Sequence, residues 1–188
     1  MTHPDVTPSD TLAALLDAYQ LAWPDEPTVG RFREFLTSGE ALQGKTNLRR
    51  HITASTWIVN PPRTRVLLTH HAKLGIWVQL GGHTDEGEEW TDAALREARE
   101  ESGLSQLDLV TAGLFDLDIH PIPARGDTPG HDHYDLRFLV VADDTSPLVI
   151  SDESTALAWV DLSGLGRYTE EESQIRMARK TTGYRSPS

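Results

Sequence analysis

Three glutamates in one expected helix carry the clearest chemical signal in this sequence. Thr91 suits the N-cap of that helix, and Gly103 suits a left-handed residue at its C-terminal end. Glu97, Glu100 and Glu101 are spaced i, i+3 and i+4, which places them on one helix face. Carboxylates this close repel one another unless a cation joins them, and oxygen ligands suit Mg²⁺, Mn²⁺ or Ca²⁺ better than Zn²⁺. A solvated surface helix is the alternative, because runs of charge usually face water.

The residues around these glutamates follow a longer pattern of fixed spacing. Its fixed positions are filled by Gly82, Glu88, Arg96, Glu97, Glu100, Glu101, Gly103 and Leu104. This 23-residue pattern resembles the Nudix box, the signature of the Nudix hydrolase superfamily. Ala98 stands where that family more often has a larger aliphatic residue. So many matched positions favour a functional site over a surface helix.

The resemblance implies a mixed β-sheet between helices and a metal-dependent hydrolase. The expected substrate is a nucleoside diphosphate linked to another moiety, and the expected cofactor is Mg²⁺ or Mn²⁺. By resemblance, Glu97, Glu100 and Glu101 hold the metal together with the carbonyl of Gly82. A metal neutralises charge on the phosphate oxygens, and a base must orient the attacking water. Glu97, Glu100 and Glu153 are the candidates for that base, and the sequence does not choose among them.

Three residues around the acidic helix have expected supporting roles. Arg96 should orient the acidic side chains by pairing with Glu88 or a neighbouring glutamate, and such a pair also stabilises the fold. Glu88 and Gly103 are accordingly interpreted as structural. Glu153 precedes an expected strand, in a loop where Nudix proteins often carry an acidic residue near the metal. An ordinary polar turn is the alternative for that loop.

Seven of the eight histidines lie between residues 51 and 133, at the ends or on the polar faces of expected strands. They suggest a pocket rich in hydrogen-bond donors that contact phosphate or sugar. The expected substrate contacts are His70, His83, His120, His131, His133, Lys73 and Arg137. His131 and His133 have an alternative role as two ligands of a softer metal, because residues two apart share a strand face. That role requires further ligands. The histidine-rich segments are similar to a bacterial Nudix subgroup without a secure substrate.

The composition of the chain excludes several classes of functional site and partner. The chain has 188 residues and no Cys, which excludes disulfides, thiolate metal sites and a cysteine nucleophile. Its net charge of −12 argues against general nucleic-acid binding. No apolar run reaches the length of a membrane span, and the N-terminus lacks a signal-peptide core. We therefore expect a cytoplasmic protein with a small nucleotide-like substrate and no nucleic-acid or membrane partner.

The order of expected elements is typical of an α/β (α+β) fold. We expect an N-terminal helical extension over 1–44, a Nudix hydrolase domain over 45–182 and a loose tail over 183–188. The apolar N-terminal helices are compatible with a homodimer. The expected strands are 51–59, 65–71, 76–80, 114–120, 131–140, 148–150 and 156–160, with a loop at 121–130 and a last helix after Thr169.

The sequence disfavours two other function classes. An isomerase of the isopentenyl-diphosphate type resembles chemistry that needs a Cys, and this chain has none. A catalytically silent Nudix-fold sensor usually loses box glutamates, whereas all are present here. Within the hydrolases, Pro121 favours an ADP-ribose or nucleotide-sugar-like substrate by resemblance. Trp57, Trp77 and Trp159 could stack a base, although large aromatic residues more often belong to the core.

Overall fold

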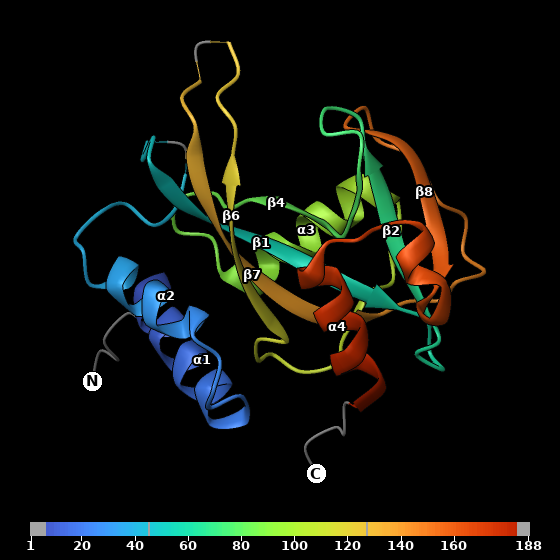
Figure 1. The fold of residues 1–188 in the computed structure, drawn as a ribbon, viewed down its shortest axis with the longest axis horizontal. Helices are drawn as coiled ribbons and strands as arrows, with labels where there is room; N and C mark the ends of the chain where they lie inside the picture. Colours follow the sequence, from blue (N-terminus) through green and yellow to red (C-terminus); the bar gives the residue numbers. More distant parts are fainter. Residues whose placement is uncertain (1–6, 45, 127, 184–188) are drawn as a thin grey trace.

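The computed structural model describes residues 7–44, 46–126 and 128–183 and contains one curled, mixed eight-stranded sheet with helices on both faces (Figure 1). The helices are α1 (Pro8–Ala22), α2 (Thr28–Leu36), α3 (Trp90–Ser102), the 3₁₀ helix η1 (Leu162–Arg167) and α4 (Glu172–Gly183). The strands are β1 (Arg50–Val59), β2 (Arg65–His71), β3 (Trp77–Val78), β4 (Leu80–His83), β5 (Asp108–Leu109), β6 (Asp116–Ile122), β7 (His131–Val141) and β8 (Ser154–Asp161). The expected α/β (α+β) sandwich is confirmed.

Strands β1 and β7 form the centre of the sheet and run parallel to each other. The sheet order is β3-β2-β1-β7-β5, with β4 also pairing with β1, β6 with β7 and β8 with β2. Every other pairing is antiparallel. Nearly all of β1 is buried, as expected for a strand that is covered on both faces.

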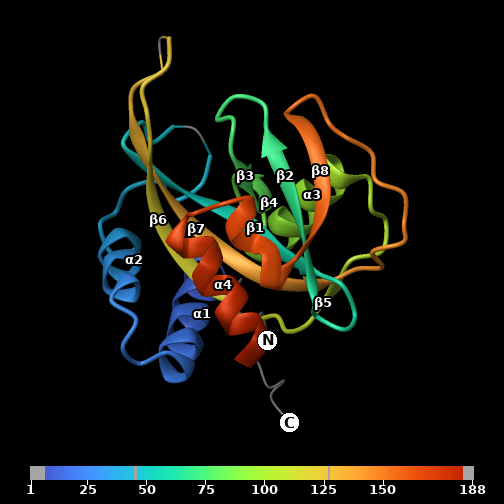
Figure 2. The same ribbon diagram turned by 45° about the vertical axis from the view of Figure 1, so that its right-hand side comes forward.

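The two faces of the sheet are covered by different helices. Ile52 and Ala54 of β1 pack in a cluster with α1, α2 and the start of α3. Trp57 and Val59 of the same strand point the other way and pack with Met177 of α4. Figure 2 accordingly shows α4 in front of the sheet and α3 behind it.

Helices α1 and α2 pack directly on the sheet. Phe32 and Phe35 of α2 lie with their ring centroids 5.1 and 4.9 Å from that of Tyr134 on β7. The indole of Trp90, at the start of α3, donates a hydrogen bond of 2.8 Å to the carbonyl of Pro8. The apolar stripe of the N-terminal helices is therefore buried against the same chain.

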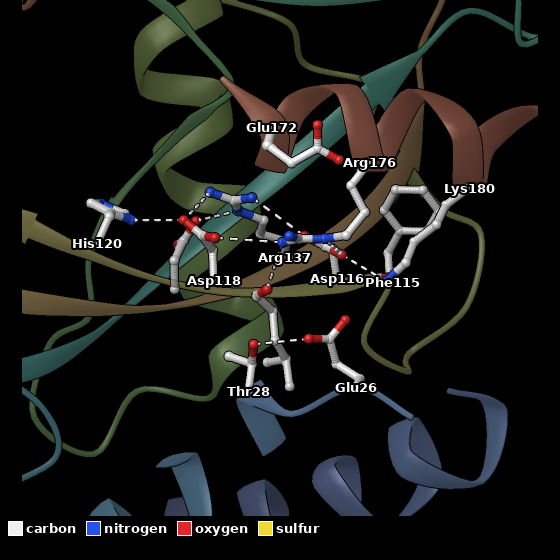
Figure 3. A network of polar contacts seen from close by, with 12 residues as sticks. Glu26, Thr28, Phe115, Asp116, Asp118, His120, Arg137, Glu172, Arg176 and Lys180 are labelled. Atoms are coloured by element: carbon white, nitrogen blue, oxygen red, sulfur yellow. Dashed lines mark hydrogen bonds and ion pairs between the residues drawn. The ribbon is translucent and has the colours of Figure 1, made fainter. Parts of the chain in front are cut away.

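A buried ion network fastens α4 to the sheet (Figure 3). Lys180 and Arg176 of α4 both contact the fully buried carboxylate of Asp116, at 2.6 and 2.8 Å. Arg137 of β7 approaches Asp116 at 3.3 Å and Asp118 at 3.1 Å. Such buried charges are tolerated only because each is paired, so removing one partner is costly.

The structure corrects several expected element boundaries. Leu148–Ile150 is not a strand; the Val149 amide instead donates 2.8 Å to the Ser102 carbonyl at the end of α3. The expected strand over 76–80 divides into β3 and β4, and β4 carries both glycines into the sheet. Helix α3 begins earlier than expected, because Glu89 rather than Thr91 is its extended N-cap residue. Gly103 has the expected left-handed conformation, with a φ of 73°.

None of the helices among the described residues is long and apolar enough to pass through a membrane. The tail expected over 183–188 lies outside the described residues except for Gly183, which ends α4.

Candidate active site

The acidic helix α3 and strand β4 form the wall of a cavity of about 390 Å³. The cavity is lined by Gly82, His83, Asp85, Arg96, Glu97, Glu100, Glu101, Ser151 and Glu153. All four residues expected to hold a metal therefore border one space, together with the expected orienting arginine and the expected loop glutamate.

Two consecutive glycines allow β4 to lie between α3 and β1. A Cβ atom on Gly82 would stand only 2.7 Å from the carboxylate of Glu97. A Cβ atom on Gly81 would stand 2.2 Å from the Cβ of Ser55 on β1, and Gly81 has a φ of 155°. A side chain at position 81 would therefore clash with β1, and one at position 82 would displace the Glu97 carboxylate. The Glu97 carboxylate consequently rests directly on the backbone of β4.

Arg96 joins the elements that surround the cavity. Its guanidinium binds both carboxylate oxygens of Glu88 at 2.9 Å and donates 3.0 Å to the carbonyl of His83. It also donates 2.9 Å to Glu97 and approaches Glu100 at 3.5 Å. The hydrogen bonds from Arg96 lower the pKa of Glu88, so that carboxylate stays ionised as a fixed partner. The expected pairing of Arg96 with Glu88 is thus present as a two-point contact.

The inner carboxylates of α3 are held where ionisation is costly. Glu101 is only 7% exposed and accepts a hydrogen bond of 3.3 Å from the amide of Gly81. Burial, reinforced by the charges of Glu97, Glu153 and Glu100, raises the pKa of Glu101 to about 8. Burial also raises the pKa of Glu97. A cation among these oxygens would reverse this effect, because it favours the charged form of each ligand.

Another part of the cavity wall comes from the loop that precedes β8, which contributes Ser151 and Glu153. The carbonyl of Glu153 accepts 2.9 Å from the amide of Ala72, which ties this loop to the connection between β2 and β3. The hydroxyl oxygen of Ser151 is buried and has no hydrogen-bond partner among the described residues. A buried hydroxyl that lines a cavity without a partner indicates a missing polar group. The five carboxylates that line the cavity and this hydroxyl offer only oxygen atoms as metal ligands, which fits Mg²⁺ or Mn²⁺.

The expected substrate contacts are divided between different parts of the molecule. Among the histidines that the structure describes, only His83 lines the cavity. The imidazole of His70 instead pairs with the hydroxyl of Thr155 on β8. His120, His131 and His133 lie on the face of the sheet that carries α4, where the His133 ring is within 5.5 Å of both other rings, measured between centroids. Lys73 lies in the connection between β2 and β3 and does not line the cavity.

Two expected ligand contacts do not agree with the burial of the side chains. Arg137 has a side chain only 3% exposed, and it is paired with Asp116, Asp118 and Asp135. Its expected contact with substrate is therefore wrong, and it belongs to the network that holds α4. Trp57 is fully buried, and its indole donates 2.8 Å to Thr181, so it cannot stack on a base.

Sequence reasoning missed three residues that the structure brings into clusters. Asp85 and Ser151 line the cavity, and His51 joins the histidines at the start of β1. Asp85 could have been found from its place inside the box, and Ser151 from its place beside Asp152-Glu153. His51 gave no such signal, because only the pairing of β1 with β7 places it beside His133.

Comparison with known proteins points to one family. A family model described as the NUDIX domain matches residues 49–180 of this chain. The m7GpppN-mRNA hydrolase NUDT17 of Xenopus laevis is 33% identical over 95 residues, which cover 47% of this chain and 32% of that protein. The chain thus spans about a third of the length of this curated relative.

Solved structures have the same fold. A NUDIX-family hydrolase from Clostridium perfringens is 27% identical and superposes with a TM-score of 0.55, over 71% of this chain and 97% of that one. The dihydroneopterin triphosphate pyrophosphohydrolase of E. coli is 17% identical, with a TM-score of 0.56 over 77% of this chain and 100% of that one. Because its sequence identity is only 17%, the E. coli protein shows a similarity of fold alone.

Proposed function

This chain belongs to the Nudix family, and on that premise we propose that it hydrolyses a pyrophosphate bond in a nucleoside diphosphate linked to another moiety. The family match confirms the resemblance that the box spacing predicts. The observation that carries the proposal is the single cavity in which Glu97, Glu100, Glu101 and Glu153 meet. So many carboxylates around one small space have little use in a protein that binds no cation.

We assign the metal to the oxygen ligands of α3 and β4. Glu97, Glu100 and Glu101 would hold Mg²⁺ or Mn²⁺, with Gly82 as a further neighbour. When bound, the ion neutralises charge on the phosphate oxygens and lowers the pKa of a coordinated water. Arg96 keeps Glu97 in place through its hydrogen bond of 2.9 Å, and the contact of Arg96 with Glu88 keeps the arginine in place.

The general base must take a proton from the attacking water. Glu97, Glu100 and Glu153 remain the candidates, and they differ in their surroundings. Glu97 accepts a hydrogen bond from Arg96, Glu100 has a side chain 61% exposed, and Glu153 lines the cavity from the loop before β8. Replacement of the base with Gln should lower kcat by about 100-fold or more while cation affinity is kept. Replacement of a ligand should weaken Mg²⁺ binding as well, so kcat and Mg²⁺ titrations of the three Gln variants distinguish the roles.

The substrate should be small and nucleotide-like. The net charge of −12 disfavours a long nucleic acid, because each phosphate contact needs a local positive charge. An ADP-ribose or nucleotide-sugar-like substrate stays our preferred prediction. The similarity to the m7GpppN-mRNA hydrolase NUDT17 adds capped nucleotides to the candidates. His83 is the histidine best placed to contact the substrate, because it lines the cavity.

A substrate screen tests the whole proposal. The full chain would be incubated with nucleotide sugars, dinucleotides, nucleoside triphosphates and cap analogues in Mg²⁺ or Mn²⁺, and the products would be identified. We expect cleavage of a phosphorus anhydride in at least one class and loss of turnover with Glu101→Gln. Tight binding without turnover across the panel would instead identify a ligand sensor. A cytoplasmic location and a homodimer also remain predictions.

A further inference from the structure

A second cluster of possible ligands lies on the face of the sheet that carries α4, and of its members only His83 also lines the carboxylate cavity. Its members are His51, His83, His120, His131 and His133. The strand register explains the cluster, because His133 is the direct partner of His51 in β1 and of His120 in β6. His83 is the partner of Thr53, two residues along β1 from His51. We call these five residues the histidine cluster.

Three members of the histidine cluster have the separation of metal ligands. His51, His131 and His133 each offer one nitrogen within 4.8 Å of the other two. The Nε2 atoms of His131 and His133 are 3.2 Å apart. Two nitrogens bound tetrahedrally to Zn²⁺ at about 2.0–2.1 Å stand about 3.3 Å apart, so this pair already fits. The nitrogen of His51 must approach by at most about 1.5 Å to reach the same spacing, which side-chain rotation can supply.

The backbone fixes which ring nitrogen of two members carries the hydrogen. Nδ1 of His131 lies 3.0 Å from the carbonyl oxygen of Pro129, and Nδ1 of His51 lies 3.4 Å from that of Asn47. A carbonyl oxygen only accepts, so both Nδ1 atoms carry hydrogen and both Nε2 atoms carry a lone pair. Hydrogen bonds of this kind orient the histidines of metal sites.

Within the histidine cluster, the surroundings of His133 favour the uncharged form of its ring. Burial, followed by the influence of the neighbouring histidines, lowers the pKa of His133 to about 2. A neutral imidazole is the form that binds a metal, so no proton has to be displaced from this ring.

We propose that His51, His131 and His133 form a binding site for a divalent transition-metal ion such as Zn²⁺. Imidazole nitrogens suit Zn²⁺, Ni²⁺ and Co²⁺, whereas the oxygen ligands of the cavity suit Mg²⁺ or Mn²⁺. The two sites would therefore select different ions. Water, His83 or His120 completes the coordination; the ring centroids of these two histidines lie 5.3 and 5.5 Å from that of His133.

Such an ion would join the start of β1 to the end of the β6–β7 pair, which projects beyond the rest of the sheet (Figure 1). His131 and His133 would then serve the ion in place of the substrate contacts expected from the sequence. The proposal does not depend on the hydrolase activity, because none of its three ligands lines the carboxylate cavity.

The test is a Zn²⁺ titration of the full chain, prepared without a histidine tag and stripped with a chelator. Isothermal calorimetry would be run with millimolar Mg²⁺ present, so that the carboxylate cavity is occupied. Co²⁺ would be used in parallel, because its visible absorption reports nitrogen ligands and coordination number. We expect one Zn²⁺ per chain and a tetrahedral Co²⁺ spectrum.

Matched variants assign the ion to its ligands. His131→Ala and His133→Ala should each weaken Zn²⁺ binding at least tenfold, by analogy with losses of about 10–100-fold for mere supporting residues. His133→Gln is the second choice if His133→Ala does not fold. His70→Ala, outside the cluster, and Glu100→Gln, in the carboxylate cavity, should leave Zn²⁺ affinity unchanged. No stoichiometric binding, equal binding by His131→Ala and His133→Ala, or loss of binding in Glu100→Gln alone would each overturn the proposal.

Discussion

The buried carboxyl of Glu101 should make the metal-free protein lose stability as the pH rises. Its pKa of about 8 in the folded chain exceeds the usual value of 4.5, so the folded state keeps a proton that the unfolded chain releases. Between those two pH values, unfolding releases a proton, and a higher pH therefore favours the unfolded chain. This loss of stability is absent below the usual pKa of 4.5 and complete above the folded-state pKa of about 8.

The size of this effect follows from the two pKa values. At about 1.4 kcal/mol per pKa unit, Glu101 costs about 1.4 kcal/mol of stability at pH 5.5 and about 4 kcal/mol at pH 7.5. Glu101→Gln removes the titration, and its amide oxygen can still accept the hydrogen bond from Gly81. The free energy of unfolding of the variant, relative to that of the wild type, should therefore rise by about 2.5 kcal/mol from pH 5.5 to pH 7.5. Groups common to both proteins cancel in this comparison.

Urea unfolding in a chelator at the two pH values measures this difference. Glu100→Gln is the matched control, because it removes an exposed carboxylate from the same helix face. Added Mg²⁺ should raise the stability of the wild type more at pH 7.5 than at 5.5, and that of Glu101→Gln much less. If the stability of Glu101→Gln relative to wild type is the same at both pH values, Glu101 ionises normally and the reasoning fails.

Three other substitutions probe the supporting geometry. Gly82→Ala should lower kcat/KM about 100-fold, because the added Cβ displaces the Glu97 carboxylate. The control Gly30→Ala, in α2 with open space around it, should not alter activity. Equal rates for the two variants would show that the close approach of Gly82 to Glu97 is unimportant. Arg96→Lys keeps the charge but loses the two-point contact with Glu88, so Mg²⁺ affinity should fall about 10–100-fold in a titration; unchanged affinity would remove the orienting role. Lys180→Met removes one partner of the buried Asp116 and should lower the free energy of unfolding, measured in urea, by about 3 kcal/mol. The control Arg179→Met, which removes an exposed ion pair, should change it little. Equal losses of stability in the two variants would contradict the argument from burial.

The acidic helix could be predicted because all its information is local. Glu97, Glu100 and Glu101 share a face through helix periodicity alone, and Gly103 ends the helix through its own backbone preference. The central strands were also predictable from their apolar runs. The division into the short strands β3 and β4 was not predictable, because the residues from Ile76 to Leu80 read as one mostly apolar strand with a single polar residue, Gln79. Only the tertiary pairing of β3 with β2 and of β4 with β1 divides them.

The role of Arg137 shows why polar faces are harder to interpret. Its position on a strand face beside His133 and Asp135 is equally compatible with a substrate pocket and with a buried network. The deciding fact is the position of α4, which covers this face and brings Arg176 and Lys180 to Asp116 (Figure 3). An amphipathic helix carries no signal for the strand on which it packs, so the burial of Arg137 could not be derived.

The carboxylate cavity and the histidine cluster also differ in how far they could be predicted from neighbouring residues in the sequence. The glutamates of α3 and the glycine pair before them lie within residues 81–104, so the chemistry of this part of the carboxylate cavity could be inferred from spacing. The histidine cluster depends on β1 lying parallel to β7, where paired residues such as His51 and His133 are 82 positions apart in the sequence, and on β6 pairing with the other edge of β7. His51 and His133 become neighbours only in that register, and a shift of one residue would turn His51 to the opposite face of the sheet. A Zn²⁺ affinity that falls with either residue would therefore also test the strand register, because it requires the two side chains to share one face.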